Sequence, residues 1–403
     1  MPVIKATRPV QSTPEPLPNV TGHHTIDGRD SAGAEAVRVT PSYSKHVAHL
    51  LITGGAGFIG SHTALVLLQA GHSLVVLDNF ANSSPEALRR VAELAGLSDD
   101  AAAPSERLQV LAGDIRHPDD LDRALATPAP CGGPVDGVIH FAGLKAVGES
   151  VQQPLRYWDV NVNGSRLLLE AMQRHGCRTL VFSSTSTVYG EPQQFPISER
   201  CATDPLHPYA QTKLAVEWML QALESSEAGW CIARLRYFNP VGAHPSGRIG
   251  ENPLGIPNNL FPFITQVASG QRPELRIFGD DWPTPDGTGI RDYLHVMDLA
   301  EAHGLAMDRL LQQGGSLPVL NLGTGRGLSV LEVVQAFETV TGRPIPRTIA
   351  PRRDGDVARL EGCSQLAADT LGWRANRSLE QMCRDGWAWQ SANPQGYNNR
   401  TSV

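Results

Sequence analysis

Tyr209 and Lys213 could take part in catalysis, because a tyrosine and a lysine here stand four positions apart in the sequence. On a helix, residues at this spacing share one face. A free tyrosine has a pKa of about 10 and is a weak base at neutral pH, but a neighbouring ammonium group favours the phenolate. Tyr209 could then take up and return a proton during a reaction. Such pairs also occur by chance on protein surfaces, so the interpretation depends on what surrounds them.

A cluster of hydroxyl side chains lies roughly two dozen residues before this pair, in the stretch Phe182-Ser-Ser-Thr-Ser-Thr-Val-Tyr-Gly190. Hydroxyls gathered at the end of an apolar, strand-like run usually indicate only a turn. We expect Ser183 and Ser184 to satisfy backbone groups or to line a site. Tyr189 has no lysine four positions further on. We therefore expect it to pack and hydrogen-bond beneath the site rather than act as a base.

Three glycines, Gly54, Gly57 and Gly60, follow a short apolar run and open a nearly apolar stretch that extends to Ala70. In a dinucleotide-binding loop, the first glycine permits a tight turn, the second lets the backbone approach a pyrophosphate, and the third lets helix and strand pack closely. The helix N-terminus adds amide donors and a positive dipole. By itself, this spacing could equally be an ordinary glycine turn.

Asp78 ends the next strand-like run, at about the 20-residue distance from the loop that dinucleotide sites show. A carboxylate there can accept hydrogen bonds from both ribose hydroxyls of an adenosine. It would repel a 2′-phosphate, so NAD is favoured over NADP. Strand, loop, helix, strand and acid together predict a dinucleotide site. The positive ring of a bound nicotinamide would also favour the Tyr209 phenolate.

These groups need a scaffold, and the sequence predicts one of alternating strands and helices. Short apolar runs predict strands at 49–53, 73–77, 108–111, 137–141, 179–182 and 231–235. Such alternation predicts an α/β fold with a Rossmann-type, doubly wound parallel sheet that helices cover on both faces. Two further stretches, 97–105 and 127–134, look like loop insertions. After about residue 240, Pro, Gly and Asn become dense, which predicts a smaller mixed α/β C-terminal region that binds substrate.

The expected organisation has four parts. They are a disordered N-terminal extension at 1–46, an NAD-binding Rossmann domain at 47–235 to which later segments return, a mainly substrate-binding region at 236–398, and a tail at 399–403. The extension is rich in Pro, Thr, Gly and charge and has no periodicity. A transit peptide is the alternative, which the acidic residues Glu15, Asp27, Asp30 and Glu35 disfavour.

The composition of the 403-residue chain argues against several classes of function. Its net charge of −7 gives no reason to expect nucleic acid or an anionic membrane as a partner. No window approaches the roughly 18 uninterrupted apolar residues of a membrane span. The six cysteines form no Cys-x-x-Cys pair or Cys/His cluster, so no metal site is expected. Because the N-terminus has no apolar signal segment, we expect a cytoplasmic enzyme.

The glycine loop and the Tyr-x-x-x-Lys pair together resemble the extended form of the short-chain dehydrogenase/reductase superfamily. Four longer blocks are similar to the UDP-glucose 4-epimerase family within it, and they run His140-Phe-Ala-Gly-Leu-Lys-Ala-Val-Gly-Glu-Ser150, Leu235-Arg-Tyr-Phe-Asn-Pro-Val-Gly-Ala-His-Pro-Ser-Gly247, Gly255-Ile-Pro-Asn-Asn-Leu260 and Gly287-Thr-Gly-Ile-Arg-Asp-Tyr-Leu-His-Val-Met-Asp-Leu299. The resemblance extends from about residue 48 to 398. It implies an NAD-dependent isomerase that interconverts UDP-glucose and UDP-galactose in galactose metabolism and nucleotide-sugar supply, and that forms a homodimer.

The resemblance also implies that Thr185, Tyr209 and Lys213 are the catalytic residues. The Tyr209 phenolate would remove the proton from the sugar 4-hydroxyl while C4 gives its hydride to NAD. The 4-keto sugar would turn in the pocket and take the hydride back on its other face, so NAD ends as it began and stays bound. Thr185 would hydrogen-bond the 4-oxygen in either orientation, and Lys213 would also hold the nicotinamide ribose.

Two sets of binding residues follow from the same resemblance. Besides the three glycines, Tyr209 and Lys213, the expected cofactor contacts are Phe58, Ile59, Asp78, Asn79, Asn82, Ser83, Asp114, Ile115, Phe141, Ala142, Gly143, Lys145, Asn161 and Phe238. The expected substrate contacts are Lys145, Thr185, Tyr209, Asn239, Asn258, Asn259, Leu260, Phe278, Arg291, Arg353, Asp356 and Leu360. The two arginines suit a diphosphate clamp, because a guanidinium group binds phosphate oxygens bidentately. Taken singly, Phe141 and Phe238 could be plain core residues, and Val160 is the alternative to Asn161.

Leu360 aligns with the position that gates the sugar pocket in the family. Relatives with tyrosine there resemble enzymes restricted to glucose and galactose, and relatives with a smaller residue accept bulkier N-acetylated sugars. Leucine is intermediate, which predicts partial room for an acetamido group. An epimerase that acts also or mainly on UDP-N-acetylglucosamine and UDP-N-acetylgalactosamine is therefore the alternative function.

Three further functions were weighed against the epimerase. A sugar-nucleotide dehydratase would need carboxylates directly after Thr185, where this chain has Ser186 and Thr187. An epimerase that acts on UDP-glucuronate would need cationic or amide side chains around the C6 carboxylate. Chemistry alone leaves this function open, although the four sequence blocks favour a neutral sugar. A non-enzymatic NAD-binding sensor would typically have lost the tyrosine or the lysine, and both are present here.

Overall fold

The computed structural model describes residues 47–97, 106–226, 228–257, 259–353 and 355–398. These residues belong to one compact unit. The predicted extension at 1–46, the tail at 399–403 and most of the insertion predicted at 97–105 lie outside them. The other predicted insertion is confirmed, since residues 127–134 contain neither helix nor strand. Among the described helices, none combines the length and the apolarity needed to cross a bilayer.

A seven-stranded parallel sheet forms the centre of this unit, in the order β10-β6-β5-β4-β1-β2-β3. The strands span His49–Thr53 (β1), Ser73–Asp78 (β2), Leu108–Ala112 (β3), Gly137–His140 (β4), Thr179–Thr185 (β5), Cys231–Tyr237 (β6) and Leu320–Leu322 (β10). The six strands predicted from the sequence are confirmed, and so is the fold class. The short strand β10 was not predicted, because three residues give too little periodicity to see.

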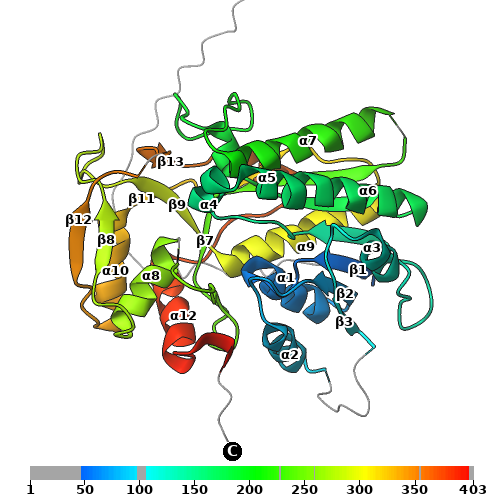
Figure 1. The fold of residues 1–403 in the computed structure, drawn as a ribbon, viewed down its shortest axis with the longest axis horizontal. Helices are drawn as coiled ribbons and strands as arrows, with labels where there is room; N and C mark the ends of the chain where they lie inside the picture. Colours follow the sequence, from blue (N-terminus) through cyan, green and yellow to red (C-terminus); the bar gives the residue numbers. More distant parts are fainter. Residues whose placement is uncertain (1–46, 98–105, 227, 258, 354, 399–403) are drawn as a thin grey trace, which may run out of the picture. The chain divides into compact units, whose positions relative to one another are not determined.

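Helices cover both faces of this sheet (Figure 1). In β1, Leu50 and Ile52 face one apolar core with α1 (Phe58–Gln69), α2 (Pro85–Leu94) and α9 (Val296–Gln313). Leu51 faces the opposite core, with α3 (Pro118–Leu125), α6 (Gly164–Arg174) and α7 (Pro208–Ser226). Both faces of β1 and β2 are therefore buried, which explains why these strands are continuous apolar runs rather than alternating ones.

The strand order reverses at β1, which pairs with β2 on one side and with β4 on the other. In open parallel sheets, ligands bind in the crevice outside the carboxyl ends of the strands at such a point. The glycine loop directly follows β1, so the fold brings the loop to this crevice. The loops after β2 and β4 flank the glycine loop on its two sides.

A second group of elements follows β6 and lies beside one end of the central sheet (Figure 1). The strands β7 (Asn239–Val241), β9 (Ile290–His295), β11 (Gly327–Ser329) and β13 (Arg359–Leu360) form one small sheet, and β8 (Leu275–Phe278) pairs with β12 (Arg347–Ala350). They pack with α8 (Leu260–Ala268), α10 (Val330–Thr341) and α12 (Leu379–Ala392). Because β10 and α9 return to the central sheet, residues after 236 contribute to both parts. The domain division at 235/236 stays a prediction.

Candidate active site

The glycine loop joins β1 to α1 by a turn that other residues would not fit. Gly54 has φ +72°, and a Cβ there would lie 2.6 Å from the backbone nitrogen of Ala142. A Cβ on Gly60 would lie 2.4 Å from the carbonyl oxygen of Gly54, so helix and loop touch directly. No side chain caps the N-terminus of α1, and its first turn contains no acidic residue. The amide groups of this helix end are therefore suited to an anionic group.

Asp78 lies at the end of β2 and turns its carboxylate toward this loop. Oδ2 accepts a hydrogen bond from the backbone nitrogen of Ala56 over 2.9 Å, and Oδ1 accepts from the backbone nitrogen of Phe80 and from Ser83 Oγ. The side chain is buried. The carboxylate thus shapes the glycine loop and the next turn, and it sits where the sequence predicted an adenosine ribose.

The ends of β2 and β3 are also joined. Asn79 Nδ2 donates to Asp114 Oδ2 over 2.9 Å. Arg116 donates to both carboxylate oxygens of Asp114 and holds the pKa of that carboxyl well below its usual range. Arg116 also contacts Asp159 at 3.0 Å, so its charge is shared between two carboxylates. The neighbouring Ile115 is buried in the core beneath α3 and α6.

The loop after β4 forms the other wall of the crevice. The backbone nitrogens of Phe141 and Ala142 both donate to the carbonyl oxygen of Thr53, which ties this loop to the end of β1. Asn161 lies in a π-helical turn, Trp158–Asn163, and its side chain exchanges two hydrogen bonds with the backbone of Leu144. Single π-turns of this kind are frequent at functional sites. A Cβ on Gly143 would lie 3.0 Å from Asn161 Oδ1, so this loop presses closely on that side chain.

Tyr209 and Lys213 lie on the first two turns of α7, on the face that packs against β5. Both side chains are buried, as is Thr185 at the end of β5. Lys213 Nζ donates to the carbonyl oxygen of Ser183 over 2.9 Å and lies 5.0 Å from the centre of the Phe182 ring. The Thr185 hydroxyl lies close enough to the Tyr209 phenol to lower its pKa. The structure therefore brings together the three residues that the resemblance named as catalytic.

Burial shifts the protonation of both groups on α7. It raises the pKa of Tyr209 to about 12, and the nearby Thr185 hydroxyl opposes that rise. It lowers the pKa of Lys213 to about 8. In the protein alone the phenol is thus protonated at neutral pH, and the lysine is mostly charged. A further positive charge in the site is what would favour the phenolate.

Four of the expected substrate residues meet at the small sheets. Arg353 Nε lies 2.9 Å from Asp356 Oδ2, and Arg291 Nη2 lies 4.0 Å from Asp356 Oδ1. The Arg353 guanidinium group also lies 4.6 Å from the centre of the Phe278 ring. Burial lowers the pKa of Arg291. Two guanidinium groups held by one carboxylate form a cationic cluster that suits a diphosphate.

The remaining expected substrate residues start β7 and α8. Asn239 is the first residue of β7, and Leu260 is the first residue of α8. Asn259 precedes α8, but its side chain makes no capping hydrogen bond and instead donates to Glu251 Oε1 over 3.2 Å. Asn258 lies outside the described residues.

Leu360 is 6% exposed and packs in a small apolar cluster next to the hydroxyl-rich turn. The cluster contains Val188, Tyr189, Ile197, Leu214, Phe238, Val357 and Leu360. Tyr189 Oη donates to Asn321 Oδ1 over 2.7 Å, which confirms that this tyrosine packs and hydrogen-bonds beneath the site. Leu360, the expected gate residue, and Phe238, an expected cofactor residue, thus share one cluster.

The structure differs from the sequence prediction at Ser183 and Ser184, whose hydroxyls bind other side chains. Ser183 Oγ pairs with His303 Nε2 at 2.8 Å, and Ser184 Oγ donates to Glu217 Oε1. Arg236 Nε donates to the same carboxylate over 2.9 Å. This buried network was missed. Its signals were a glutamate four residues after Lys213 and an arginine inside an apolar strand.

The chain is similar to known proteins over most of its length. A family model described as GDP-mannose 4,6 dehydratase matches residues 51–386. UDP-glucose 4-epimerase 4 of Oryza sativa subsp. japonica is 50% identical over 372 residues, which cover 92% of this chain and 98% of that protein.

Two solved structures are similar as well. A UDP-glucose-4-epimerase from Stenotrophomonas maltophila with bound NAD and formylated UDP-arabinopyranose is 47% identical, with a TM-score of 0.81 over 86% of this chain and 99% of that one. A UDP-glucose 4-epimerase from Bifidobacterium longum in complex with NAD+ and UDP is 44% identical, with a TM-score of 0.80 over 86% of this chain and 99% of that one.

Proposed function

Because the chain belongs to the UDP-glucose 4-epimerase family, we propose that it interconverts UDP-glucose and UDP-galactose by reversible epimerisation at C4, with NAD as a tightly bound cofactor. The observation that carries the proposal is the meeting of Thr185, Tyr209 and Lys213 at the end of β5, beside the crevice where the strand order reverses. An oxidation that is later reversed needs one group that moves a proton and another that accepts and returns a hydride.

The described residues fit NAD. The uncapped N-terminus of α1 and the glycine loop would hold its phosphates, and Asp78 would accept the adenosine ribose hydroxyls. Arg116, the nearby cation, is already shared between two carboxylates, which leaves little to attract a 2′-phosphate. When bound, NAD supplies the hydride acceptor and a positive ring.

Tyr209 would act as the base. Its raised pKa in the protein alone implies that it becomes a phenolate only when the positive ring of the cofactor stands nearby. Thr185 would orient the sugar 4-oxygen, since its hydroxyl lies within hydrogen-bond reach of the phenol. Lys213 is held by the Ser183 carbonyl, so its charge stays at a fixed place below the tyrosine.

Substrate binding would rest on the cationic cluster. Arg291 and Arg353 would clamp the diphosphate, with Asp356 orienting both guanidinium groups. Asn239, Asn259 and Leu260 would line the approach from β7 and α8. A UDP-sugar bound in this way would extend its hexose toward Tyr209.

Dehydration, the activity in the description of the matching family model, is less well supported. Elimination of water would need an acid and a base beside the sugar. Here the positions after Thr185 hold Ser186 and Thr187, and Thr187 Oγ1 is hydrogen-bonded to Thr185 Oγ1 at 3.0 Å. Two hydroxyls without charge cannot take those roles.

Turnover of N-acetylated UDP-sugars is the second candidate, because Leu360 is smaller than a tyrosine and packs only against apolar neighbours in its cluster. Assays with UDP-galactose and UDP-N-acetylgalactosamine would compare the two substrates directly. No turnover of the N-acetylated sugar would contradict the partial room that leucine predicts. The homodimer, the cytoplasmic location and a role in galactose metabolism stay predictions; gel filtration tests the first.

The test of the main proposal is consumption of UDP-galactose by the purified protein without added NAD. We expect UDP-glucose as product and NAD released on denaturation. Tyr209→Phe should lower kcat by roughly 10²–10⁴-fold, the usual range for loss of an acid–base group, and should still contain NAD. A variant with nearly full activity would contradict the assigned base.

A further inference from the structure

Glu251 connects two parts of the candidate site that no sequence pattern links. Its Oε1 accepts a hydrogen bond from Lys145 Nζ over 3.1 Å and another from Asn259 Nδ2 over 3.2 Å. Lys145 belongs to the loop after β4, which walls the cofactor crevice, and Asn259 precedes α8 in the substrate part. One carboxylate oxygen therefore joins both parts.

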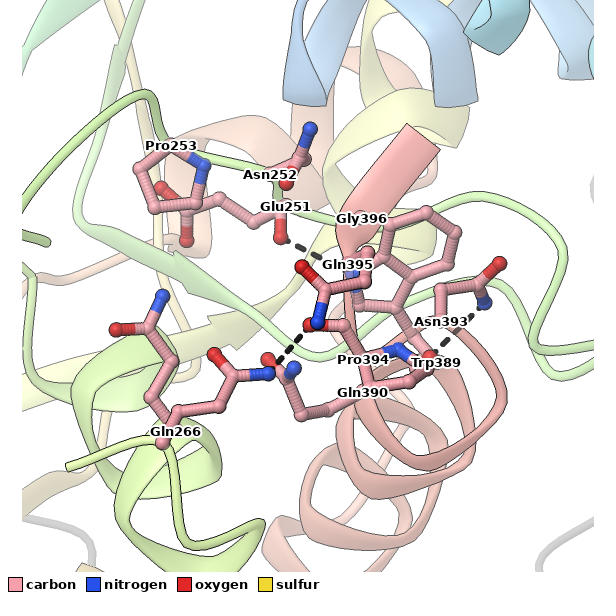
Figure 2. Close-up of a pocket in the computed structure, with 11 residues that line it drawn as sticks. Glu251, Asn252, Pro253, Gln266, Trp389, Gln390, Asn393, Pro394, Gln395 and Gly396 are labelled. Carbon is pink, nitrogen blue, oxygen red and sulfur yellow. Dashed lines mark hydrogen bonds between the residues drawn. The ribbon is translucent and has the colours of Figure 1, made fainter. Parts of the chain in front are cut away.

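Hydrogen bonds and packing hold the backbone at Gly250 and Glu251 in place. Figure 2 shows the Trp389 indole nitrogen donating to the Glu251 carbonyl oxygen, over 3.0 Å. The neighbouring Gly250 exchanges two hydrogen bonds with the Tyr397 hydroxyl, both 3.1 Å long. A Cβ on Gly250 would lie 2.3 Å from Cγ of the Trp389 indole, so the chain rests flat against that ring. The Glu251 carboxylate thus projects from a fixed main chain.

Lys145 has no comparable support of its own. Its side chain is 54% exposed, whereas that of Glu251 is 11% exposed. An ammonium group on a flexible four-carbon stem samples many rotamers unless a partner holds it. The Glu251 carboxylate is therefore the better-ordered partner of the ion pair, and it determines the position of the Lys145 ammonium group.

The segment that begins at Glu251 touches the cofactor crevice a second time. The backbone nitrogen of Leu254 lies 3.4 Å from Asn82 Oδ1, in the turn that follows β2. Asn82 and Lys145 therefore follow the two strands that flank β1. Residues 251–254 therefore connect the loop after one flanking strand with the loop after the other.

We propose that Glu251 is a positioning residue that holds Lys145 and fastens residues 251–254 between the two loops of the cofactor crevice, so that the cofactor is retained between turnovers. The inference rests on the proposed function. Epimerisation returns NAD to its starting state, so the enzyme gains nothing from exchanging it. A segment fastened between these loops would slow that exchange.

The test is the rate of NAD release from the purified holoenzyme, followed as an added NAD-dependent dehydrogenase reduces the freed NAD. Glu251→Ala removes a partly buried ion pair and a hydrogen bond to a charged group, so release should be about tenfold faster. Glu251→Gln keeps the shape and one acceptor oxygen, and should lie between Glu251→Ala and wild type. The matched control is Glu170→Gln, which breaks an exposed ion pair with Arg166 on α6 and should release NAD at the wild-type rate.

A Lys145→Met variant tests whether Glu251 acts through the lysine. If it does, the double variant Glu251→Ala/Lys145→Met should release NAD clearly more slowly than the product of the two single effects predicts. Wild-type release from Glu251→Ala, or effects that simply multiply, would overturn the positioning role. Release is measured without substrate, so this result is separate from UDP-galactose turnover by the wild type, which tests the proposed function.

Discussion

Glu217 gives the sharpest test of how the fold positions the candidate catalytic residues. It lies on α7 four residues after Lys213 and eight after Tyr209, so all three share one helix face. Its side chain and that of Arg236 on β6 are almost completely buried, and Ser184 on β5 donates to the same carboxylate. Glu217 therefore ties α7 to two neighbouring strands of the central sheet.

Glu217→Leu would leave the Arg236 guanidinium group buried without its anion. Removing one partner of a buried ion pair typically costs about 3–5 kcal/mol. At about 2.1 cal/mol/K of unfolding entropy per residue, a loss of about 4 kcal/mol in a folded unit of roughly 350 residues lowers Tm by about 5 °C. Because Tyr209 is two turns away on the same helix, kcat should fall by about tenfold or more as α7 shifts on β5.

Thermal unfolding and initial rates with UDP-galactose measure these two effects. Glu170→Leu is the matched control, because it makes the same substitution in an exposed ion pair, whose loss typically costs under about 1 kcal/mol. Glu217→Leu/Arg236→Met should regain most of the lost stability, since no buried charge is then unpaired. If Glu217→Leu is no less stable than Glu170→Leu, the reasoning about the buried pair is wrong.

Three further outcomes follow from the site. Thr185→Ser keeps the hydroxyl and should stay within a few-fold of the wild-type kcat, whereas Thr185→Val should lose about 10²-fold in initial-rate assays. Burial lowers the pKa of Lys213 to about 8, below its unfolded value of 10.5, so the buried charge destabilises the fold until it is lost. In chemical denaturation without NAD, the free energy of unfolding of wild type should therefore rise relative to that of Lys213→Met between about pH 8 and pH 10.5, by up to about 3 kcal/mol. A flat difference would contradict that assignment. Arg353→Lys loses the fork that holds Asp356 and the contact over the Phe278 ring, so KM for UDP-galactose should rise by about tenfold with little change in kcat.

Much of the central sheet could be predicted from the sequence because inner strands such as β1 and β2 are buried on both faces. Runs such as 49–53 and 73–77 are continuous and apolar, and each is closed by Gly or Asp at the point where the chain turns. The sequence also predicted that Tyr209 and Lys213 lie on the same face, because both belong to one helix. Strand β10 was not, since Leu-Asn-Leu joins the sheet only through its parallel pairing with β6, far back in the chain.

Contacts between distant parts of the chain were the ones that sequence reasoning missed. Glu251 contacts Lys145 across 106 positions, and Ser184 contacts Glu217 across 33. Such pairs depend on which strands become neighbours, and no local pattern records that. Ser184 was expected to satisfy backbone groups or to line a site, and it differs for the same reason: a buried carboxylate on α7 needs a donor, and Ser184 provides it.

The hydroxyl-rich end of β5 thus acts on three successive turns of α7, with one residue for each turn. Thr185 lies beside Tyr209 and lowers the pKa of its phenol, the carbonyl of Ser183 accepts from Lys213, and the hydroxyl of Ser184 donates to Glu217. The hydroxyl of Ser183 pairs with His303 on α9 and the hydroxyl of Ser184 donates to Glu217 on α7, so neither hydroxyl is available to a substrate. Thr185 stands last, at the carboxyl end of the strand where the crevice opens. Among the hydroxyls of Ser183, Ser184 and Thr185, only that of Thr185 is therefore left for chemistry, because the other two bind buried side chains on α9 and α7.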